Sequence, residues 1–354
     1  MTSQANQKDF SSDSVKLLAD LSNASGVSGG ERAVREIIRE ALKSFNAEIQ
    51  EDALGNVIVH RLSNVDGAKK VMLAAHMDET GFMITGDDGD GLYPFALVGD
   101  VDIRQLPGKP VLVGKNRIPG VIGARDIHLT TAEQRKQAIP LSTLRIDVGP
   151  KGKVETGDRA VFATEFRQNG TSLFGKALDN RLGVAILIDL LTQLPETLDV
   201  YAVFNSQKEL GNRGEMVAAF NLEPDFVILV DAAEAADLPT AQPDQENSRF
   251  GCRLGAGPVV FPVHRKVISD SALFEHFLQT AEKENIPYQV GQAGMVETRV
   301  EAAGAINKVK AGMRSITISV PVRYAHTAIN LANLRDWENT TRLLKAGLAS
   351  LSNL

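Results

Sequence analysis

Short runs of mainly apolar residues, bounded by polar or turn residues, mark four strands in this chain. The runs cover residues 71–75, 201–204, 226–230 and 316–320. Apolar runs of this length are typical of strands in a sheet that is covered on both faces. The pattern therefore predicts the buried strands of an α/β protein.

Helical periodicity appears in three places. Residues 13–46 contain two helical patterns on either side of the glycine-rich segment 26–30, and a third pattern covers residues 182–191. The second pattern carries apolar residues three and four positions apart, which are Val34, Ile37, Ile38 and Leu42. Strands and helices therefore alternate along most of the chain, as in a βα architecture.

The pattern changes between about residues 85 and 166. Short segments such as 111–113 and 145–148 are interrupted by Gly or Pro every few residues, which favours a small β-rich domain. Because strands and helices alternate on both sides, this domain is better interpreted as an insertion than as a tandem neighbour. We therefore predict a core of residues 1–84 and 167–354 and an inserted domain of residues 85–166.

Composition narrows the class of protein. The 354 residues carry a net charge of -6, and 43% of them are hydrophobic, which is enough for a sizeable core. The sequence has no basic cluster interleaved with aromatic residues, so nothing in it indicates nucleic-acid binding. No segment has the ~18 apolar residues of a membrane-spanning helix. The single cysteine, Cys252, excludes an intrachain disulfide and a thiolate zinc cluster. We therefore expect a cytoplasmic protein that binds neither nucleic acid nor membrane.

Five acids and histidines stand at the ends of the predicted elements. Four follow the predicted strands by a few residues at most, and the fifth stands where the helix over 182–191 begins. In order along the chain they are His76, Asp179, Glu209, Asp231 and His326. Ligands of open α/β sheets gather outside the carboxyl ends of the strands, so residues distant in sequence can meet there. The pattern predicts a metal site at one edge of the sheet.

Each of these residues also has an ordinary structural explanation. His76 and Asp78 point to the same side of a strand, and a buried histidine bonded to a carboxylate is common in cores. Asp179 could cap a helix, and Glu209 could be a solvated loop acid. Asp231 is harder to explain, because an ionised acid beside an apolar strand needs a partner or a metal. Five such coincidences at five element ends are much less probable than any one alone.

Two histidines and three carboxylates suit Zn²⁺, Co²⁺ or Mn²⁺, and one shared carboxylate would hold two ions about 3.5 to 4 Å apart. Such a pair activates a water and polarises a carbonyl, so hydrolysis of an amide is the expected chemistry. The remaining candidates have no ligand-like or base-like neighbours in the sequence and are interpreted as structural: His60, His128, His264, His276 and Cys252.

At these residues the chain resembles the M42 family of dinuclear metallo-aminopeptidases, which contains glutamyl and tetrahedral aminopeptidases. The similarity runs nearly end to end. It includes the segments 26–29, 75–81, 175–183, 209–214, 255–258 and 321–326, and Asp231. It implies a metallopeptidase core with a mixed central sheet flanked by helices, and an inserted β-barrel-like lid or dimerisation domain. It also implies peptide substrates and homo-oligomers, commonly dodecamers.

The resemblance further assigns the five ligands to two divalent ions. His76 and Asp231 would bind one ion, Glu209 and His326 would bind the other, and Asp179 would bridge the pair.

Residues beside these ligands both follow and depart from the family pattern. The resemblance places Asp78 behind the ligands and implies a cis peptide at Asp179–Asn180. Lys208, however, stands where a glutamate usually acts as general base. In an ungapped alignment, Ala302 replaces an aspartate and Asn330 replaces a glutamate.

These departures leave two hypotheses. The first is an aminopeptidase that is slow or altered, because general base catalysis contributes about 10²- to 10⁴-fold. It would use a metal-activated water or Lys208 in place of the usual base. Two dications and burial would lower the pKa of Lys208 by as much as ~3 to 5 units. The alternative is a catalytically silent relative that serves as a binding or assembly module. In that case the Lys208 ammonium could take the place of one metal ion. Polysaccharide hydrolysis has little support, because glycosidases usually work with a carboxylate pair and no metal pair.

Overall fold

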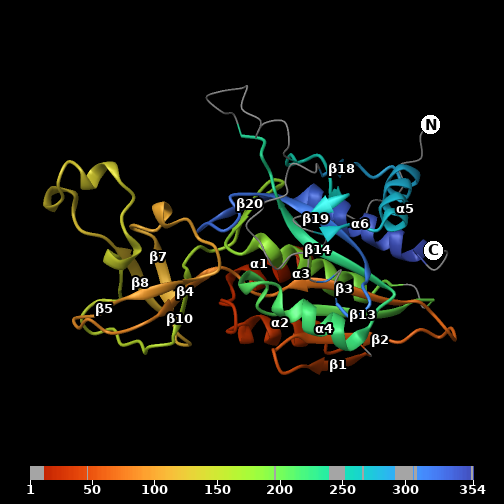
Figure 1. The fold of residues 1–354 in the computed structure, drawn as a ribbon, viewed down its shortest axis with the longest axis horizontal. Helices are drawn as coiled ribbons and strands as arrows, with labels where there is room; N and C mark the ends of the chain where they lie inside the picture. The colour runs from red at the N-terminus through yellow and green to blue at the C-terminus, as the bar shows by residue number, and fades with distance from the viewer. Residues whose placement is uncertain are drawn as a thin grey trace.

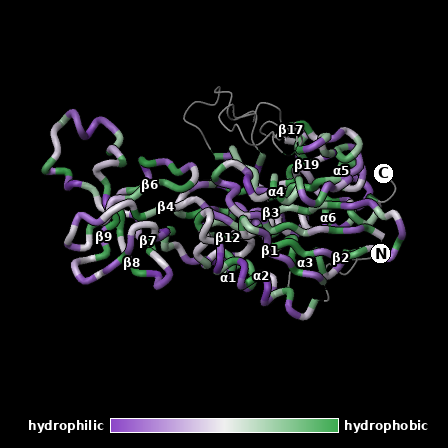
Figure 2. Tube along the Cα trace, turned by 60° about the horizontal axis from the view of Figure 1, so that its bottom comes forward, coloured by the Kyte–Doolittle hydropathy of each residue, from purple (hydrophilic) through white to green (hydrophobic). Residues whose placement is uncertain are grey.

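The computed structural model describes residues 12–354 except for 46, 195–196, 239–251, 265–266, 292–305, 307–308 and 352–353. Its described strands form a large sheet at one end of the molecule and a smaller sheet at the other, and both views show this separation (Figures 1 and 2). The predicted class, an α/β core with a mixed sheet and a small β-rich part, is confirmed.

The larger sheet is mixed. Nine of its described strands lie in the order β1-β2-β13-β3-β14-β19-β20-β12-β11, and β15 and β18 extend it beside β19. The strands are β1 (Glu48–Glu51), β2 (Val57–Arg61), β3 (Lys70–His76), β11 (Arg167–Asn169), β12 (Ser172–Gly175), β13 (Asp199–Asn205), β14 (Phe226–Glu234), β15 (Val259–Phe261), β18 (Gln289–Val290), β19 (Arg314–Arg323) and β20 (Asn330–Asn333). The four predicted strands are β3, β13, β14 and β19. They are adjacent and parallel, so their carboxyl ends meet at one edge.

Six described helices surround this sheet: α1 (Ser12–Asn23), α2 (Arg32–Leu42), α3 (Leu178–Leu191), α4 (Arg213–Leu222), α5 (Ser271–Lys283) and α6 (Leu334–Ser350). On β3, Leu73 and Ala75 belong to the hydrophobic cluster that contains α1, α2, α3, α5 and α6. Met72 and Ala74 belong instead to the cluster with α4. The two-residue period of a strand thus sends alternate apolar residues into two cores, which explains why the predicted strands are apolar on both faces.

The smaller sheet has its own core. Its described strands run in the order β5-β9-β8-β7-β10-β4-β6, and every pair is antiparallel. They are β4 (Gly81–Ile84), β5 (Leu92–Tyr93), β6 (Phe95–Val98), β7 (Pro110–Val113), β8 (Ile118–Gly123), β9 (Arg145–Asp147) and β10 (Arg159–Phe162). Inside it, the ring of Phe82 contacts those of Phe95 and Phe162 edge to face, with centroids 5.3 and 5.2 Å apart. We refer to residues 81–162 as the barrel-like body.

The chain between β8 and β9 carries three short 3₁₀ helices, Ile127–Leu129, Gln134–Lys136 and Leu141–Thr143, and projects from the barrel-like body at the left of Figure 1. A two-stranded hairpin, β16 (Val263–His264) and β17 (Val267–Ile268), completes the described strands. None of the described helices is long and apolar enough to cross a lipid bilayer.

Truncating the core helix α3 should destabilise the protein. Leu187 is fully buried in the main hydrophobic cluster, so Leu187→Ala should lower the free energy of unfolding by about 2–5 kcal/mol, through lost transfer energy and a cavity. Leu62 is 75% exposed, and Leu62→Ala should change it by less than about 0.5 kcal/mol. Urea titrations followed by circular dichroism measure both. Equal losses in the two variants would contradict this packing.

Candidate metal centre

Strand register brings two of the five predicted residues together. His76 is the last residue of β3, and Asp231 lies within β14 rather than after it as predicted, because β14 continues to Glu234. Leu229 pairs with Ala74 across these strands, so Asp231, two residues further on, comes level with His76. Their nearest side-chain atoms, His76 Nε2 and Asp231 Oδ1, are 3.5 Å apart.

Asp179 reaches the same place from the start of α3. Ala177, just before the helix, has a positive φ of 55°, and Asp179 and Asn180 have non-helical backbone angles. The expected cis peptide at Asp179–Asn180 is present. Asp179 Oδ1 lies 3.2 Å from His76 Nε2, and its other oxygen, Oδ2, lies 3.5 Å from His326 Nε2. One carboxylate thus faces both histidines, as a bridging ligand would.

Glu209 and His326 come from loops after their strands. Glu209 lies in the short 3₁₀ helix Lys208–Leu210, and His326 follows β19 by three residues. Gln207 and His326 have positive φ values of 54° and 58°, a conformation that is uncommon for non-glycine residues and recurs at functional sites. Glu209 Oε2 lies 3.6 Å from His326 Nε2, and Oε1 lies 4.0 Å from His76 Nε2.

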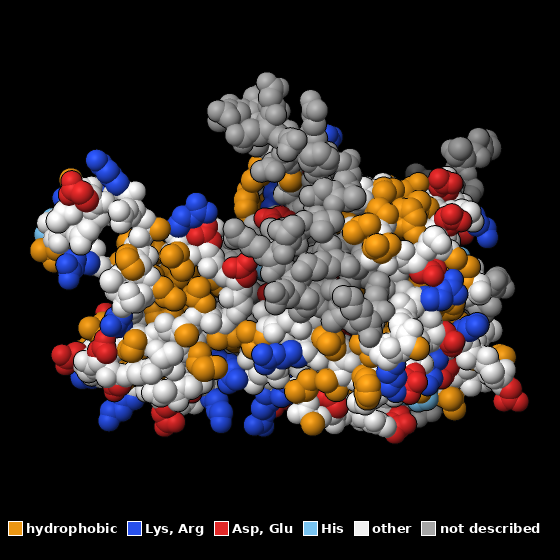
Figure 3. Space-filling model, in the orientation of Figure 1, with side chains coloured by type: hydrophobic (Ala, Val, Ile, Leu, Met, Phe, Trp, Pro, Cys, Tyr) orange, Lys and Arg blue, Asp and Glu red, His pale blue; other side chains and the backbone are white. Residues whose placement is uncertain are grey.

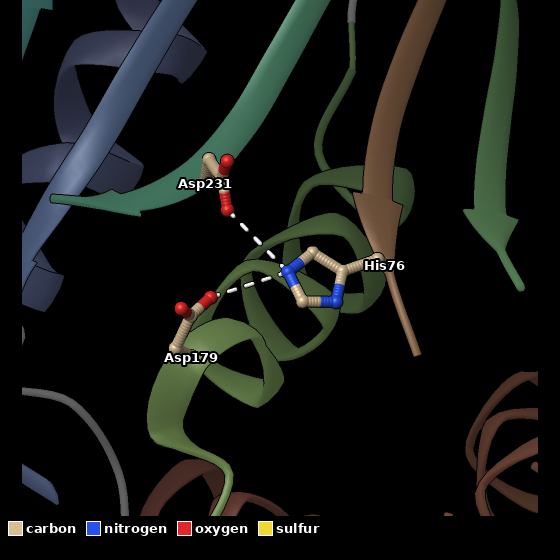
Figure 4. A group of neighbouring side chains, drawn as sticks. All are labelled: His76, Asp179 and Asp231. Carbon is tan, nitrogen blue, oxygen red and sulfur yellow. Dashed lines mark hydrogen bonds and ion pairs between the residues drawn. The ribbon is translucent and has the colours of Figure 1, made fainter. Parts of the chain in front are cut away.

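The five residues form two groups of three that share Asp179. One group is His76, Asp179 and Asp231, drawn in Figure 4, and the other is Asp179, Glu209 and His326; within each, the three ligand atoms lie within 4.8 Å of one another. His76 is also oriented as a ligand. Its Nδ1 lies 3.0 Å from the backbone carbonyl of Asp78, which can only accept a hydrogen bond, so in the neutral ring Nδ1–H donates to this carbonyl and Nε2 keeps its lone pair. The residues present therefore fit divalent metal ions bound by nitrogen and oxygen.

Lys208 lies beside both groups. Lys208 is only 6% exposed, and its Nζ donates a hydrogen bond of 3.2 Å to Glu209 Oε1. The same atom lies 4.0 Å from Asp231 Oδ1. The side chain predicted at the general-base position therefore points into the acidic cluster and not to solvent.

The electrostatics of the centre reflect its three acids. Burial and the Lys208 ammonium both lower the pKa of His76, but hydrogen bonds with Asp179, Asp231 and Asp78 outweigh them and raise it well above its usual range. Burial raises the pKa of Asp179, but Lys208 and the two histidines hold it well below the usual range. The acids thus favour the protonated forms of the two histidines, and the same negative charge would attract a metal cation.

Asp78 anchors the segment that carries Lys208 and Glu209. Its Oδ1 accepts a hydrogen bond from the backbone N–H of Lys208 at 3.0 Å, and its Oδ2 accepts from that of Glu209 at 3.0 Å. Oδ2 also accepts from the Ser28 hydroxyl at 2.6 Å. Asp78 is fully buried, and burial raises its pKa, but contacts with His76 and these donors lower it overall. Its contacts extend the sequence prediction, which placed it only behind the ligands.

Sequence reasoning missed a second buried ionic cluster next to the centre. Lys176 Nζ contacts both carboxylate oxygens of Glu79, at 2.8 and 2.9 Å, and Arg181 Nη2 contacts Glu79 Oε1 at 3.2 Å. Burial lowers the pKa of Lys176 to about 8, against the opposing effect of Glu79. Lys176 lies in the segment 175–183 that also contains Asp179, but a lysine between a strand and a helix gives no sequence signal of an ion pair with Glu79.

Asn330 has a positioning role that was not evident from its replacement of the family's glutamate. Its Oδ1 accepts from the backbone N–H of Leu178, at 3.0 Å, and its Nδ2 donates to the carbonyl of Tyr324, at 2.7 Å. It thus ties the start of α3 to the loop that carries His326. A carboxylate could not make both bonds, because it could not donate to the carbonyl.

A pocket at these residues is lined by side chains of the core and of the barrel-like body. Its lining includes Asp179, Glu209 and His326 of the centre, Glu79 and Lys176 of the second cluster, and Phe162 of the barrel-like body. Phe162 was not predicted, because only the folded topology brings β10 to this edge.

The remaining candidates lie elsewhere. His60 pairs with Asp199 at 2.6 Å, and His276 bonds the carbonyl of Gly347. Burial raises the pKa of Cys252 to about 12, so it stays a thiol. Ala302 lies outside the described residues.

Comparisons with known proteins decide the family. The model of the M42 glutamyl aminopeptidase family matches residues 55–343. The chain belongs to this family. It is 31% identical to a lysyl aminopeptidase of Pyrococcus furiosus, over 95% of this chain and 97% of that protein. An aminopeptidase structure from Desulfurococcus kamchatkensis is similar with a TM-score of 0.85 and 31% identity, over 94% of each chain.

A TET peptidase of Pyrococcus horikoshii, described as assembling into a tetrahedron or an octahedral shell, has a TM-score of 0.77 and 30% identity, over 94% of this chain and 98% of that one. The predicted M42 family and enzyme class, a metal-dependent aminopeptidase, are confirmed by these comparisons. The alternative of a catalytically silent module is not favoured.

Weakening the anchor at Asp78 should weaken metal binding by this M42 chain. In Asp78→Asn, the side-chain NH₂ group replaces one of the two oxygens that accept from the backbone N–H groups of Lys208 and Glu209. Glu209 is then held less firmly, so we expect Zn²⁺ affinity to fall about 10- to 100-fold. Competition with a chromogenic chelator measures this. Ser28→Ala removes only the hydroxyl donor and should have a smaller effect. Unchanged affinity in Asp78→Asn would exclude the anchoring role.

Proposed function

We propose that this M42 chain removes residues from the free amino end of peptides, using divalent ions held by His76, Asp179, Glu209, Asp231 and His326. The observation that carries this proposal is the convergence of these residues, from five separate segments of the chain, into two groups that share one carboxylate. Up to two ions would be held here: His76 and Asp231 would contribute to one, Glu209 and His326 to the other, and Asp179 to both. Zn²⁺, Co²⁺ and Mn²⁺ all suit these donors.

When bound, such ions lower the pKa of a water and polarise the scissile carbonyl. The chain's own residues set the remaining conditions. Glu79 and Lys176 give the pocket a polar wall next to the centre, and Phe162 adds an apolar surface from the barrel-like body. A peptide whose first peptide bond reaches the centre would therefore meet polar groups and one aromatic ring beside it.

Lys208 is the residue that makes this chain unusual. A general base must have a lone pair to accept the proton of water, and a lysine with its ordinary charge has none; the Nζ of Lys208 is directed instead at Glu209 Oε1. We infer that Lys208 holds Glu209 in place and does not act as the base. The chain is then an aminopeptidase without general base catalysis at this position, and we expect its turnover to be slow.

We further propose that the protein is a cytoplasmic homo-oligomer, up to a dodecamer, because a similar solved structure, that of PhTET1-12s, is described as a dodecamer. Hydrophobic side chains gather on the barrel-like body at the left of Figure 3. On the loop that projects from this body, Ile127 is 72% exposed and Leu129 is 62% exposed. Exposed apolar residues on a projecting loop are suited to a contact with another copy of the chain.

Peptide trimming tests the activity. A pool of free-amino peptides, incubated with the protein and Zn²⁺, Co²⁺ or Mn²⁺ and followed by mass spectrometry, should lose N-terminal residues slowly. Lys208→Glu supplies a carboxylate base and should raise kcat by about 10²- to 10⁴-fold. Lys208→Met removes the amine without supplying a base, so it should not give this increase.

Three controls define the outcome. N-acetylated peptides should remain intact, because an aminopeptidase requires a free amino end. A chelator and the Asp179→Ala variant should each abolish trimming. If the natural chain with full metal occupancy trims no peptide while Lys208→Glu does, the natural protein is a silenced relative and the proposal fails.

Assembly can be measured separately. Ile127→Asp with Leu129→Asp places charges where two copies would bury apolar side chains, so we expect dissociation to smaller species in size-exclusion chromatography with light scattering. Gln137→Asp, on the same exposed loop, should leave the mass unchanged. A doubly substituted protein that keeps its full mass would contradict an interface at this loop.

A further inference from the structure

Lys208 places an amine, which is cationic at its ordinary pKa, in a centre that is otherwise suited to two dications. Its Nζ contacts Glu209 Oε1 at 3.2 Å and Asp231 Oδ1 at 4.0 Å, and these two acids belong to different metal-binding groups. The lysine therefore lies between the groups and not at the margin of one.

The charges of the centre favour one ion over two. The three ligand carboxylates, on Asp179, Glu209 and Asp231, carry three negative charges. One dication and the Lys208 ammonium balance these charges, whereas two dications and the ammonium exceed them by two. Asp78 adds one further negative charge beside His76, and the neighbouring cluster of Lys176 and Arg181 with Glu79 adds one net positive charge, so the two leave this balance unchanged. In a buried site, excess charge of one sign is costly because water cannot screen it.

The two groups are also unequal in their contacts with Lys208. The closer contact is to Glu209, whose Oε1 accepts from Nζ and is therefore less available to a metal. In the other group, Asp179 Oδ1 and Asp231 Oδ1 both face the single Nε2 atom of His76, at 3.2 and 3.5 Å, as Figure 4 shows. The His76 side chain is 2% exposed, whereas that of His326 is 31% exposed. The His76 group is thus the more enclosed and the less occupied by the lysine.

We infer that Lys208 serves as an internal cation that replaces the second metal ion: one ion binds tightly to His76, Asp179 and Asp231, and a second binds weakly to Asp179, Glu209 and His326. This inference rests on the proposed function, because it concerns the same ligands. It predicts the metal content of the protein, a property that can be measured without turnover.

The test is equilibrium dialysis of metal-stripped protein against graded free Zn²⁺ or Co²⁺, with bound metal counted by inductively coupled plasma mass spectrometry. The natural chain should bind one ion per chain and take up a second only at free metal about 100-fold higher. Lys208→Met and Lys208→Glu should bring the two affinities closer together, and Lys208→Arg, which keeps the charge, should retain the gap. Circular dichroism verifies that each variant is folded.

Ligand variants locate the tight ion. His326→Ala should keep one tightly bound ion, whereas His76→Ala should weaken that ion about 10- to 100-fold. Two ions of equal affinity in the natural chain, or loss of the tight ion from His326→Ala alone, would overturn the inference. Trimming by a natural chain with two equal ions would reject this inference and leave the proposed function intact, whereas a chain that binds no metal would reject both.

Discussion

Three carboxylates, one buried and two partly buried, lie at one edge of a sheet and need positive charge, and much of the local structure supplies or positions it. Asp179, Glu209 and Asp231 come from a helix start, a loop and a strand, and in an apolar interior they would repel one another. Two histidines and one lysine face them. Asp78 and Asn330 then hold the backbones that carry these groups. Stability and chemistry are therefore difficult to separate here, because the groups that offset the acids are also those that would act on a substrate.

Much of this arrangement was predictable because strand direction and strand ends leave clear sequence signals. The apolar runs identified β3, β13, β14 and β19, and parallel strands bring their carboxyl ends to one edge. Five dispersed residues could thus be grouped without any knowledge of distances. The error for Asp231 was small, since a strand's length is less well specified by its apolar residues than its existence is.

Other features depend on contacts that a single sequence does not encode in any local pattern. The pairing of Lys176 and Arg181 with Glu79 joins residues about a hundred positions apart. Phe162 reaches the pocket only because β10 runs beside β4 in a separate sheet. Asn330 looked like the loss of an acid, yet its amide makes one hydrogen bond as acceptor and another as donor. In each case the residue type was visible, but its partner was set by tertiary structure.

The connection between the two sheets has a mechanical consequence. β3 ends at His76 and β4 begins at Gly81, so only four residues separate the centre from the barrel-like body, and they include Asp78 and Glu79. The connection is also tightly fitted, because a Cβ at Gly81 would lie 2.5 Å from Val27 and 2.6 Å from the carbonyl of Ala160. Because the connection is short and closely packed, a rotation of the barrel-like body would also displace Asp78, whose carboxylate anchors Glu209. Forces exerted on this body by neighbouring molecules would be transmitted directly to the geometry of the reacting groups.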